Sequence, residues 1–138
     1  MITAAELLEL HFATLVDDPQ RWQTLIADHL VWELPFAPTL GHPARLQGRE
    51  QVLAHVGFVG AVENFRFFDL QVHPGAVASE ASAEIKAEGM IRPTGRLYQQ
   101  DYVLFVRVEN GKLAFIREYF DPVRAAIALQ APIPALAG

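Results

Sequence analysis

The chain has 138 residues, of which 51% are hydrophobic, and a formal net charge of -5 at pH 7. This length fits one domain, residues 1–138, and the high apolar content predicts a cavity or a subunit interface in addition to a core. The acidic balance argues against nucleic acids and anionic membranes as partners. The absence of cysteine excludes thiolate nucleophiles and Cys-ligated zinc. No apolar stretch approaches the ~20 residues of a membrane span and no leader pattern opens the chain, so we expect a cytoplasmic protein.

The first third of the chain predicts a helical hairpin followed by a strand. Residues 3–6 form a capping-box pattern, and apolar side chains then recur at helical spacing to about Val16. Asp18-Pro19 combines an N-cap residue with a proline suited to the first helical position, which predicts a short second helix that extends to Ile26. Residues 30–34 indicate a strand, and a loop rich in proline and glycine follows it.

A third helix is predicted over residues 49–59. It places Val52 and Val59 on one face, and His55 lies beside them at helical spacing, so the histidine faces inward. By pattern alone such a residue is a core histidine with a backbone partner, yet its ordinary pKa also makes it an available acid or base. Trp32 in the first strand has two interpretations as well: core packing, or the wall of a pocket mouth.

The second half of the chain predicts a sheet. Alternating apolar and polar side chains indicate strands over residues 65–72, 81–91, 97–108 and 112–120. Asp121-Pro122 repeats the cap-and-proline start for a last short helix to about Leu129, and we expect the tail, residues 131–138, to be loosely ordered. Three helices, a bent antiparallel sheet and a short last helix make an α+β fold.

The dipeptide Asn110-Gly111 is the strongest hairpin signal in the chain. Counting outward from a two-residue turn sets Val103 opposite Glu118. One face is then predicted to hold Asp101, Val103, Phe105, Ile116, Glu118 and Phe120, and the other Tyr102, Leu104, Val106, Phe115, Arg117 and Tyr119. Because both faces are apolar, one should meet the helices or a cavity and the other, outer face should form a homodimer interface.

Glu118 is an acid in an apolar strand, between Ile116 and Phe120 on one face. A carboxyl among apolar groups keeps its proton to higher pH than a solvated one, which suits it to move protons near neutrality. The predicted register puts Asp101 on the same face, diagonally ~7–8 Å away, where two acids resist ionising together. The alternative is that this face is exposed near its end and that its acids pair with Arg96 or another base.

No metal or nucleotide motif is visible in the sequence. The other histidines lie in different elements without metal-site spacing, so we predict no metal site; they are His11, His29, His42 and His73. Neither a glycine-rich phosphate loop nor a Gly-x-Ser-x-Gly elbow occurs, which argues against nucleotide binding and a serine nucleophile.

Four segments carry a resemblance over most of the chain: residues 46–55, 98–102, 111–122 and 129–134. With the order of elements they resemble the NTF2-like cone fold of SnoaL-like cyclases and ketosteroid isomerases, and in particular the phenazine-biosynthesis PhzA/B family. The resemblance implies that Glu118, on the last long strand, and His55, on the third helix, act on a ligand in an internal pocket. A ligand-contacting tyrosine of the family matches Tyr98, which strict alternation places opposite Glu118, so this role requires a bulge between Tyr98 and Asp101.

Departures from the family pattern indicate a more apolar pocket. A ligand-contacting serine of the family corresponds to Val59, and the base and tyrosine of ketosteroid isomerases correspond to Leu34 and Phe12, so steroid-type isomerisation by those groups is not expected. Further candidate substrate contacts are Trp32, Asp101, Val103 and Phe120.

The resemblance implies a homodimer that binds a small cyclic or ketone-bearing metabolite. The implied reaction is a condensation, cyclisation or isomerisation at a carbonyl without a cofactor, with Glu118 as general acid or base and His55 as its partner. Two alternatives stay open. The protein is a non-catalytic module that holds an apolar ligand, or its sheet is only a platform for oligomerisation.

Overall fold

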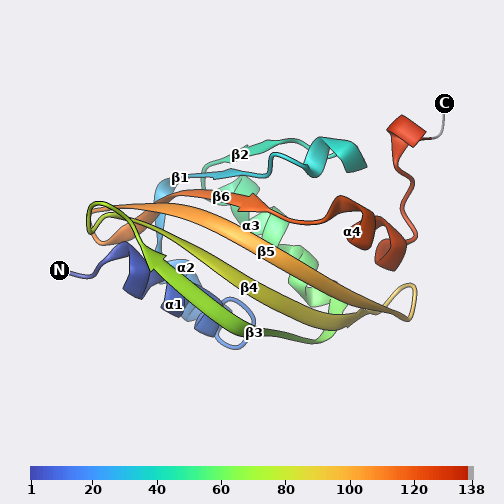
Figure 1. Ribbon diagram of the computed structural model, residues 1–138, viewed down its shortest axis with the longest axis horizontal. Helices are drawn as coiled ribbons and strands as arrows, with labels where there is room; N and C mark the ends of the chain where they lie inside the picture. The colour runs from blue at the N-terminus through green and yellow to red at the C-terminus, as the bar shows by residue number, and fades with distance from the viewer. Residues whose placement is uncertain (137–138) are drawn as a thin grey trace.

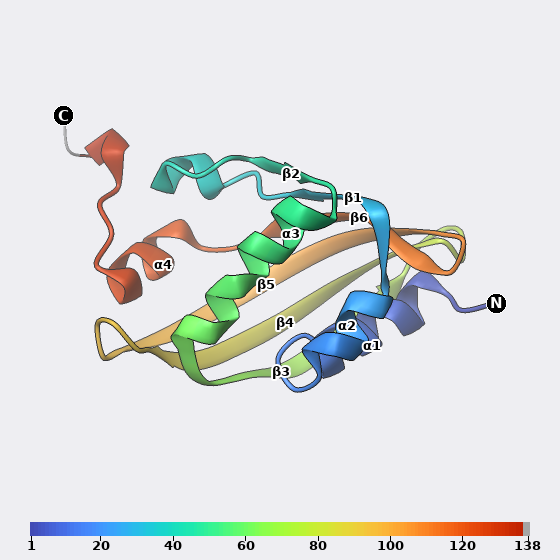
Figure 2. The same cartoon turned by 180° about the vertical axis from the view of Figure 1, so that it is seen from behind.

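The computed structural model describes residues 1–136, with a six-stranded sheet at its centre. The strand order across the sheet is β2-β1-β6-β5-β4-β3. Helices α1, α2 and α3 cross one face, which we call the inner face (Figure 2); Figure 1 looks onto the opposite, outer face. The elements in chain order are α1 (Ala4–Thr14), α2 (Pro19–Thr24), β1 (Ile26–Glu33), η1 (Ala37–Leu40), β2 (Arg45–Gln47), α3 (Arg49–Val56), η2 (Gly57–Ala61), β3 (Val62–Pro74), β4 (Glu80–Ile91), β5 (Arg96–Glu109), β6 (Lys112–Tyr119), α4 (Pro122–Leu129) and η3 (Pro134–Leu136).

This architecture confirms the α+β fold, with one difference in the sheet. β1 runs parallel to β6, whereas every other neighbouring pair is antiparallel, so the sheet is mixed. The main core fills the space between α1, α2 and the inner face, and a second apolar cluster joins η2, β3 to β5 and α4. Among the residues described, no helix is long and apolar enough to cross a membrane.

The N-terminal helices begin where their caps predict. The Thr3 hydroxyl accepts the backbone N–H of Glu6 (3.1 Å), and the Glu6 carboxylate accepts the backbone N–H of Thr3 (3.4 Å), which completes the capping box. Asp18 caps α2. Ile26 was wrongly predicted to be helical: it begins β1, because it pairs with Leu113 of β6.

The predicted third helix is divided in two. α3 ends at Val56, and the 3-10 helix η2 continues the chain, so Val59 lies on η2. At the other end of the chain, Asp121 caps α4 as predicted. Of the tail expected to be loosely ordered, residues 134–136 form η3, and residues 137–138 lie outside the described range.

The β5–β6 hairpin departs from the predicted register. The turn forms at Asn110-Gly111 as expected, but Ala114 is an additional residue in β6, a β-bulge that shifts all pairs beyond it by one. Leu104 therefore lies opposite Glu118, and Val103 lies opposite Tyr119. The predicted pairing of Val103 with Glu118 was wrong.

The bulge exchanges the predicted faces of β5. The inner face of the hairpin now carries Tyr98, Gln100, Tyr102, Leu104, Val106, Ile116 and Glu118, and the outer face carries Asp101, Val103, Phe105, Phe115, Arg117 and Tyr119. Asp101 thus does not share a face with Glu118. Tyr98 shares the inner face with Glu118, because the bulge lies in β6. A bulge was expected in β5 between Tyr98 and Asp101, but the pairing of β5 with β4 is unbroken there.

Gly89 lies where β3 bends over β4. The register of this pair shifts between Glu63 and Arg66, and Asn64 there adopts a left-handed conformation (φ 53°). A Cβ atom on Gly89 would lie 2.4 Å from Cγ1 of Val62, which is closer than real Cβ contacts come. Only glycine fits this crossing without displacing β3.

We predict that Gly89→Ala lowers the free energy of unfolding by about 1–3 kcal/mol, because the added methyl group overpacks the crossing. Urea unfolding followed by the fluorescence of the buried tryptophans measures this. The matched control is Gly57→Ala, where no atom lies within 4 Å of the added Cβ; it should change the same free energy by less than about 1 kcal/mol. Equal effects of the two substitutions would contradict the close approach at Gly89.

Candidate functional site

A cavity of about 50 Å³ lies on the inner side of the sheet, between α1, α3, η2 and the strands. It has room for one or two water molecules. The side chains that line it are His11, Phe12, Leu15, Trp32, His55, Val56, Phe58, Val59, Phe65, Phe67, Tyr102 and Glu118. Of the predicted site residues, the cavity thus brings together Glu118, His55, Val59 and Trp32.

Glu118 is the one acid in this apolar lining. Burial raises the pKa of its carboxyl from the ordinary 4.5 to about 8, because the charged form loses its hydration. Among the described residues, none forms a hydrogen bond with this carboxyl, so nothing offsets that loss. Glu118 is therefore mostly protonated at neutral pH and can donate a proton to a group in the cavity.

His55 reaches the cavity from the last turn of α3. Its ring packs edge-on against Trp32, with 5.3 Å between ring centroids. Burial lowers the pKa of His55, and the nearby His42 lowers it further. The imidazole is therefore neutral at pH 7 and can accept a proton.

His11 is a further titratable group of the cavity, which the sequence did not single out. The indole Nε1–H of Trp22 donates to Nδ1 of His11 at 2.9 Å, so the neutral ring carries its hydrogen on Nε2. Burial lowers the pKa of His11 to about 4. Its side chain lies on the α1 face that also buries Leu7 and Leu8, and that helical spacing was a usable signal.

Tyr102 was also missed, and Tyr98 lies behind it. The predicted register had assigned Tyr102 to the outer face, whereas it lines the cavity beside Glu118. Tyr98, a predicted ligand contact, is 4% exposed, and its hydroxyl lies 2.9 Å from that of Tyr102. Tyr98 therefore does not line the cavity itself but is linked to it by the hydrogen bond with Tyr102.

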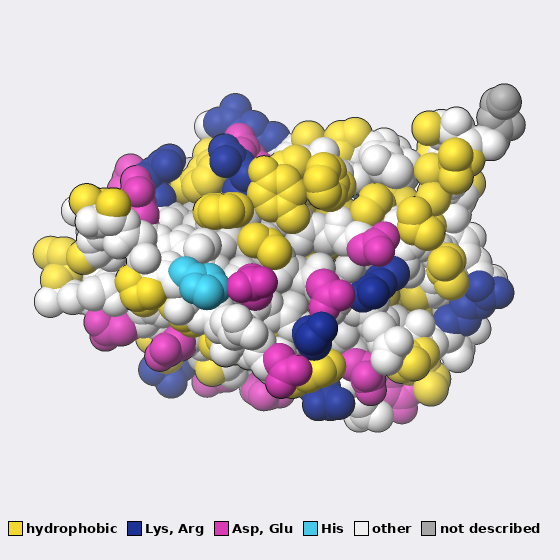
Figure 3. Space-filling view, in the orientation of Figure 1, with side chains coloured by type: hydrophobic (Ala, Val, Ile, Leu, Met, Phe, Trp, Pro, Cys, Tyr) yellow, Lys and Arg dark blue, Asp and Glu magenta, His cyan; other side chains and the backbone are white. Residues whose placement is uncertain are grey.

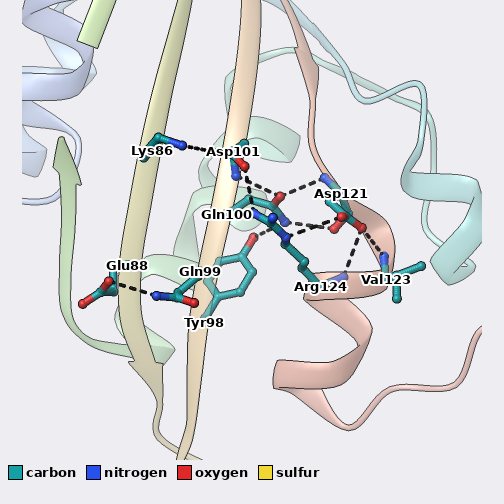
Figure 4. A network of polar contacts seen from close by, with 9 residues as sticks. All are labelled: Lys86, Glu88, Tyr98, Gln99, Gln100, Asp101, Asp121, Val123 and Arg124. Atoms are coloured by element: carbon teal, nitrogen blue, oxygen red, sulfur yellow. Dashed lines mark hydrogen bonds and ion pairs between the residues drawn. The ribbon is translucent and has the colours of Figure 1, made fainter. Parts of the chain in front are cut away.

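Asp101 lies outside the cavity, on the outer face. Its carboxylate forms ion pairs with Lys86 (2.9 Å) and Arg124 (2.8 Å), as Figure 4 shows. The hydrogen bond from Lys86 is the largest effect and lowers the pKa of this carboxyl; burial opposes it, and the hydrogen bond from Arg124 lowers the pKa further. Asp101 thus matches the alternative prediction of an exposed acid that pairs with bases. Those bases are Lys86 and Arg124 instead of Arg96.

Val103 and Phe120, two other candidate contacts, also lie away from the cavity lining. Val103 is on the outer face and is 36% exposed. Phe120 follows β6 and packs half-buried against both apolar clusters. The bulge at Ala114 explains why Val103 lies outside the cavity, because it places Val103 on the outer face and Glu118 on the inner face.

Two larger hollows lie on the outer face, with volumes of about 380 and 510 Å³. They are open to solvent, and several of their charged side chains form ion pairs, such as Lys86 with Asp101 and Arg117 with Glu33. Among residues 1–136, no group of three or more His, Asp or Glu side chains is arranged to hold a metal ion. The inner cavity is therefore the candidate site.

Comparison with known proteins agrees with this fold. The family model of the SnoaL-like domain matches residues 9–116. A PhzA/B-like protein of Pseudomonas aeruginosa is 30% identical over 130 residues, which cover 93% of this chain and 91% of that protein.

Two crystal structures show the same fold. One, a Bacillus subtilis protein described as a candidate isomerase, superposes with a TM-score of 0.83 at 24% identity and covers 94% of each chain. The other, the phenazine biosynthesis-related protein PhzB2 of Pseudomonas aeruginosa, has a TM-score of 0.73 at 17% identity and covers 94% of this chain and 89% of that one. The NTF2-like fold expected from the order of elements is thereby confirmed. This chain belongs to the SnoaL-like family, with a PhzA/B-like protein among its relatives.

Proposed function

We propose that this protein is a cofactor-independent acid–base enzyme that acts at the carbonyl of a small cyclic metabolite. One observation carries the proposal: an acid that is mostly protonated at neutral pH and a neutral imidazole, Glu118 and His55, line the same cavity. Two groups whose environments hold them in complementary protonation states form a general acid and a general base.

The two groups have distinct roles in the proposed reaction. Glu118 donates its proton to the carbonyl oxygen while His55 removes a proton from the carbon next to the carbonyl, which gives an enol, an imidazolium and a carboxylate. Return of a proton to carbon restores the ketone or gives its isomer, and attack of the enol carbon on a second electrophile gives a cyclisation or condensation. General acid–base catalysis of this kind contributes typically 10²–10⁴-fold in rate.

The cavity must widen to hold such a ligand. Its volume of about 50 Å³ is well below the ~150 Å³ of an apolar cavity that binds benzene. η2 is the wall that can move with the least loss of packing, because none of its residues is fully buried and because it carries Phe58 and Val59 into the cavity. Ligand entry by displacement of Phe58 is therefore part of the proposal.

The names of similar proteins support a small-molecule site. They refer to phenazine biosynthesis and to isomerase activity, and those activities belong to the proteins concerned. Where PhzA/B proteins carry a ligand-contacting serine, this chain has Val59, which favours a more apolar substrate. The same apolar lining favours the alternative function, a binding module that holds its ligand without chemistry.

We predict that the protein accelerates exchange of the α-hydrogens of cyclohexanone for deuterium in D₂O, measured as loss of the proton NMR signal. Glu118→Gln should reduce this rate by about 10²–10⁴-fold, because the amide keeps the volume of the side chain but cannot donate the proton. The control is Glu9→Gln, which changes an exposed carboxylate of α1. An unchanged rate in Glu118→Gln would sink the enzyme proposal, and thermal stabilisation by cyclohexanone without exchange would indicate the binding module.

We predict that protein stability falls as the pH rises from about 6.5 to about 8. Because the folded pKa of Glu118 is raised, the folded state binds more protons than the unfolded chain between pH 4.5 and about 8. His11 and His55 oppose this trend only below their ordinary pKa of 6.5, since burial lowers the pKa of both, that of His11 to about 4. The free energy of unfolding should drop by on the order of 1–2 kcal/mol between about pH 6.5 and about pH 8, and Glu118→Gln should abolish the drop. Urea titrations at each pH test this, and a drop that persists in Glu118→Gln would assign it to another group.

A homodimer through the outer sheet face is also part of the proposal. Figure 3 shows apolar side chains gathered over β6 and its neighbours on this face. Phe105 is 46% exposed and packs edge-on against Tyr119, which in turn contacts Phe36 (47% exposed). An apolar patch of this kind on an open sheet face is a typical subunit interface.

We predict that Phe105→Asp converts the dimer into a monomer, because it buries an unpaired charge in the apolar interface. Light scattering after gel filtration measures the mass. Val77→Asp, at an exposed apolar residue in the loop between β3 and β4, should leave the mass unchanged. A dimer in which Phe105→Asp has no effect would require a different interface.

A further inference from the structure

We infer that the hydroxyl of Tyr102 is a ligand-binding donor of the cavity, oriented by a hydrogen-bond relay through Gln100 and Tyr98, and that the ligand is an uncharged molecule with an acceptor oxygen. This inference rests on the proposed site and specifies its ligand chemistry. The relay starts at the backbone of Asp101 in β5 and of Asp121, the cap of α4 (Figure 4).

Two backbone groups fix the orientation of the buried Gln100 amide. Its Oε1 accepts the backbone N–H of Asp121 (2.8 Å) and that of Asp101 (3.1 Å), and both of these groups can only donate. Its Nε2 donates to the carbonyl oxygen of Asp121 (2.9 Å) and to the hydroxyl of Tyr98 (3.1 Å). Gln100 therefore acts on Tyr98 as a donor (Figure 4).

The hydroxyl of Tyr98 must pass its hydrogen on to Tyr102. Its oxygen accepts from Gln100, and its only other partner among the described residues is the hydroxyl of Tyr102 at 2.9 Å. If Tyr102 donated instead, the hydrogen of the buried Tyr98, which does not line the cavity, would have no acceptor, which costs about 1–3 kcal/mol. Tyr102 lines the cavity, where a water molecule or a ligand can accept its hydrogen. The relay therefore runs from Gln100 to Tyr98 to Tyr102.

The hydrogen at the end of the relay is free for a ligand. The Tyr102 oxygen accepts from Tyr98, and the hydrogen-bonding groups of the described residues offer its own hydrogen no acceptor. Its ring lines the cavity together with Glu118. Hydrogen bonds in such a chain polarise one another, so Tyr102 is a stronger donor than an isolated phenol.

Trp32 supplies a second donor without a partner. Its side chain is 2% exposed and lines the cavity, and the indole Nε1–H is buried with no hydrogen-bond acceptor among residues 1–136. Trp22, by contrast, donates to His11. A bound acceptor would relieve the cost of leaving the Trp32 N–H unpaired.

The charges around the cavity favour a neutral ligand over an anion. None of the described side chains that line it is Lys or Arg. His11 and His55 are neutral at pH 7 because burial lowers their pKa values, and the Glu118 carboxyl is mostly protonated. A carboxylate ligand would be buried without a counter-charge, whereas a ketone accepts hydrogen bonds at no such cost.

The test compares three probes of similar shape: cyclohexanone with a ¹³C-labelled carbonyl, methylenecyclohexane and cyclohexanecarboxylate. In the unmodified protein, the bound carbonyl carbon should shift downfield in the NMR spectrum, and the indole N–H signal of Trp32 should shift while that of Trp22 does not. Cyclohexanecarboxylate should bind more weakly than cyclohexanone. These measurements need no variant, so they hold even where a substitution impairs folding.

Tyr102→Phe should reduce the downfield carbonyl shift, because only the Trp32 N–H and the Glu118 carboxyl are left to donate, and it should weaken cyclohexanone binding by about tenfold, while methylenecyclohexane binds as before. Tyr98→Phe should reduce the shift by less than Tyr102→Phe does, because the donor loses only its polarising neighbour. Tyr119→Phe, on the outer face, is the matched control and should change neither quantity.

A carbonyl shift of unchanged size in Tyr102→Phe, tighter binding of the carboxylate, or no bound carbonyl signal overturns the inference. These outcomes are separable from failure of the proposed function. If Glu118→Gln leaves deuterium exchange unchanged but Tyr102→Phe reduces the carbonyl shift, the enzyme proposal fails and the Tyr102 donor stands. If Glu118→Gln slows deuterium exchange but Tyr102→Phe leaves the carbonyl shift unchanged, the enzyme proposal stands and the Tyr102 donor fails.

Discussion

The inner cavity depends on the β-bulge at Ala114, because side chains in a strand alternate between faces and one added residue exchanges them for the rest of the strand. With the bulge, Glu118 and Tyr102 share the helix-covered face; without it, the carboxyl would meet solvent on the outer face. The bulged residue is itself a small, buried alanine, and next to it β6 changes its pairing with the parallel strand β1. The register of three strands is thus adjusted at one place.

The electrostatics of the cavity follow from this placement. The walls are aromatic and aliphatic side chains from α1, α3, η2 and the sheet, and among the described residues no base is paired with the Glu118 carboxyl. A half-buried acid without a partner lowers its free energy by keeping its proton, and a half-buried histidine does so by losing one. The same low-polarity surroundings therefore leave Glu118 as a donor and His55 as an acceptor, without any ion pair to fix these states.

Local signals in the sequence predicted much of the fold. Signals that depend only on neighbouring residues were reliable. The structure contains the predicted caps at Thr3 and Asp18 and the turn at Asn110-Gly111, and His55 faces inward as its spacing predicted. The bulge has no such marker, since an alanine at position 114 fits a regular strand equally well. Its presence depends on pairing with β1, which is remote in sequence, so the faces of β5 were exchanged and Asp101 was wrongly placed beside Glu118.

Asp121 connects the last helix to the interior of the sheet. Its carboxylate accepts the N–H groups of Val123 and Arg124 at the start of α4, while its own backbone N–H and carbonyl hold the amide of Gln100. Folding of α4 and the direction of the Tyr98–Tyr102 hydrogen bond therefore share one anchor. Sequence changes in the C-terminal helix, remote from any ligand, can consequently alter the polarity that a ligand meets, and relatives with different C-termini need not share a substrate even where their cavity linings are identical.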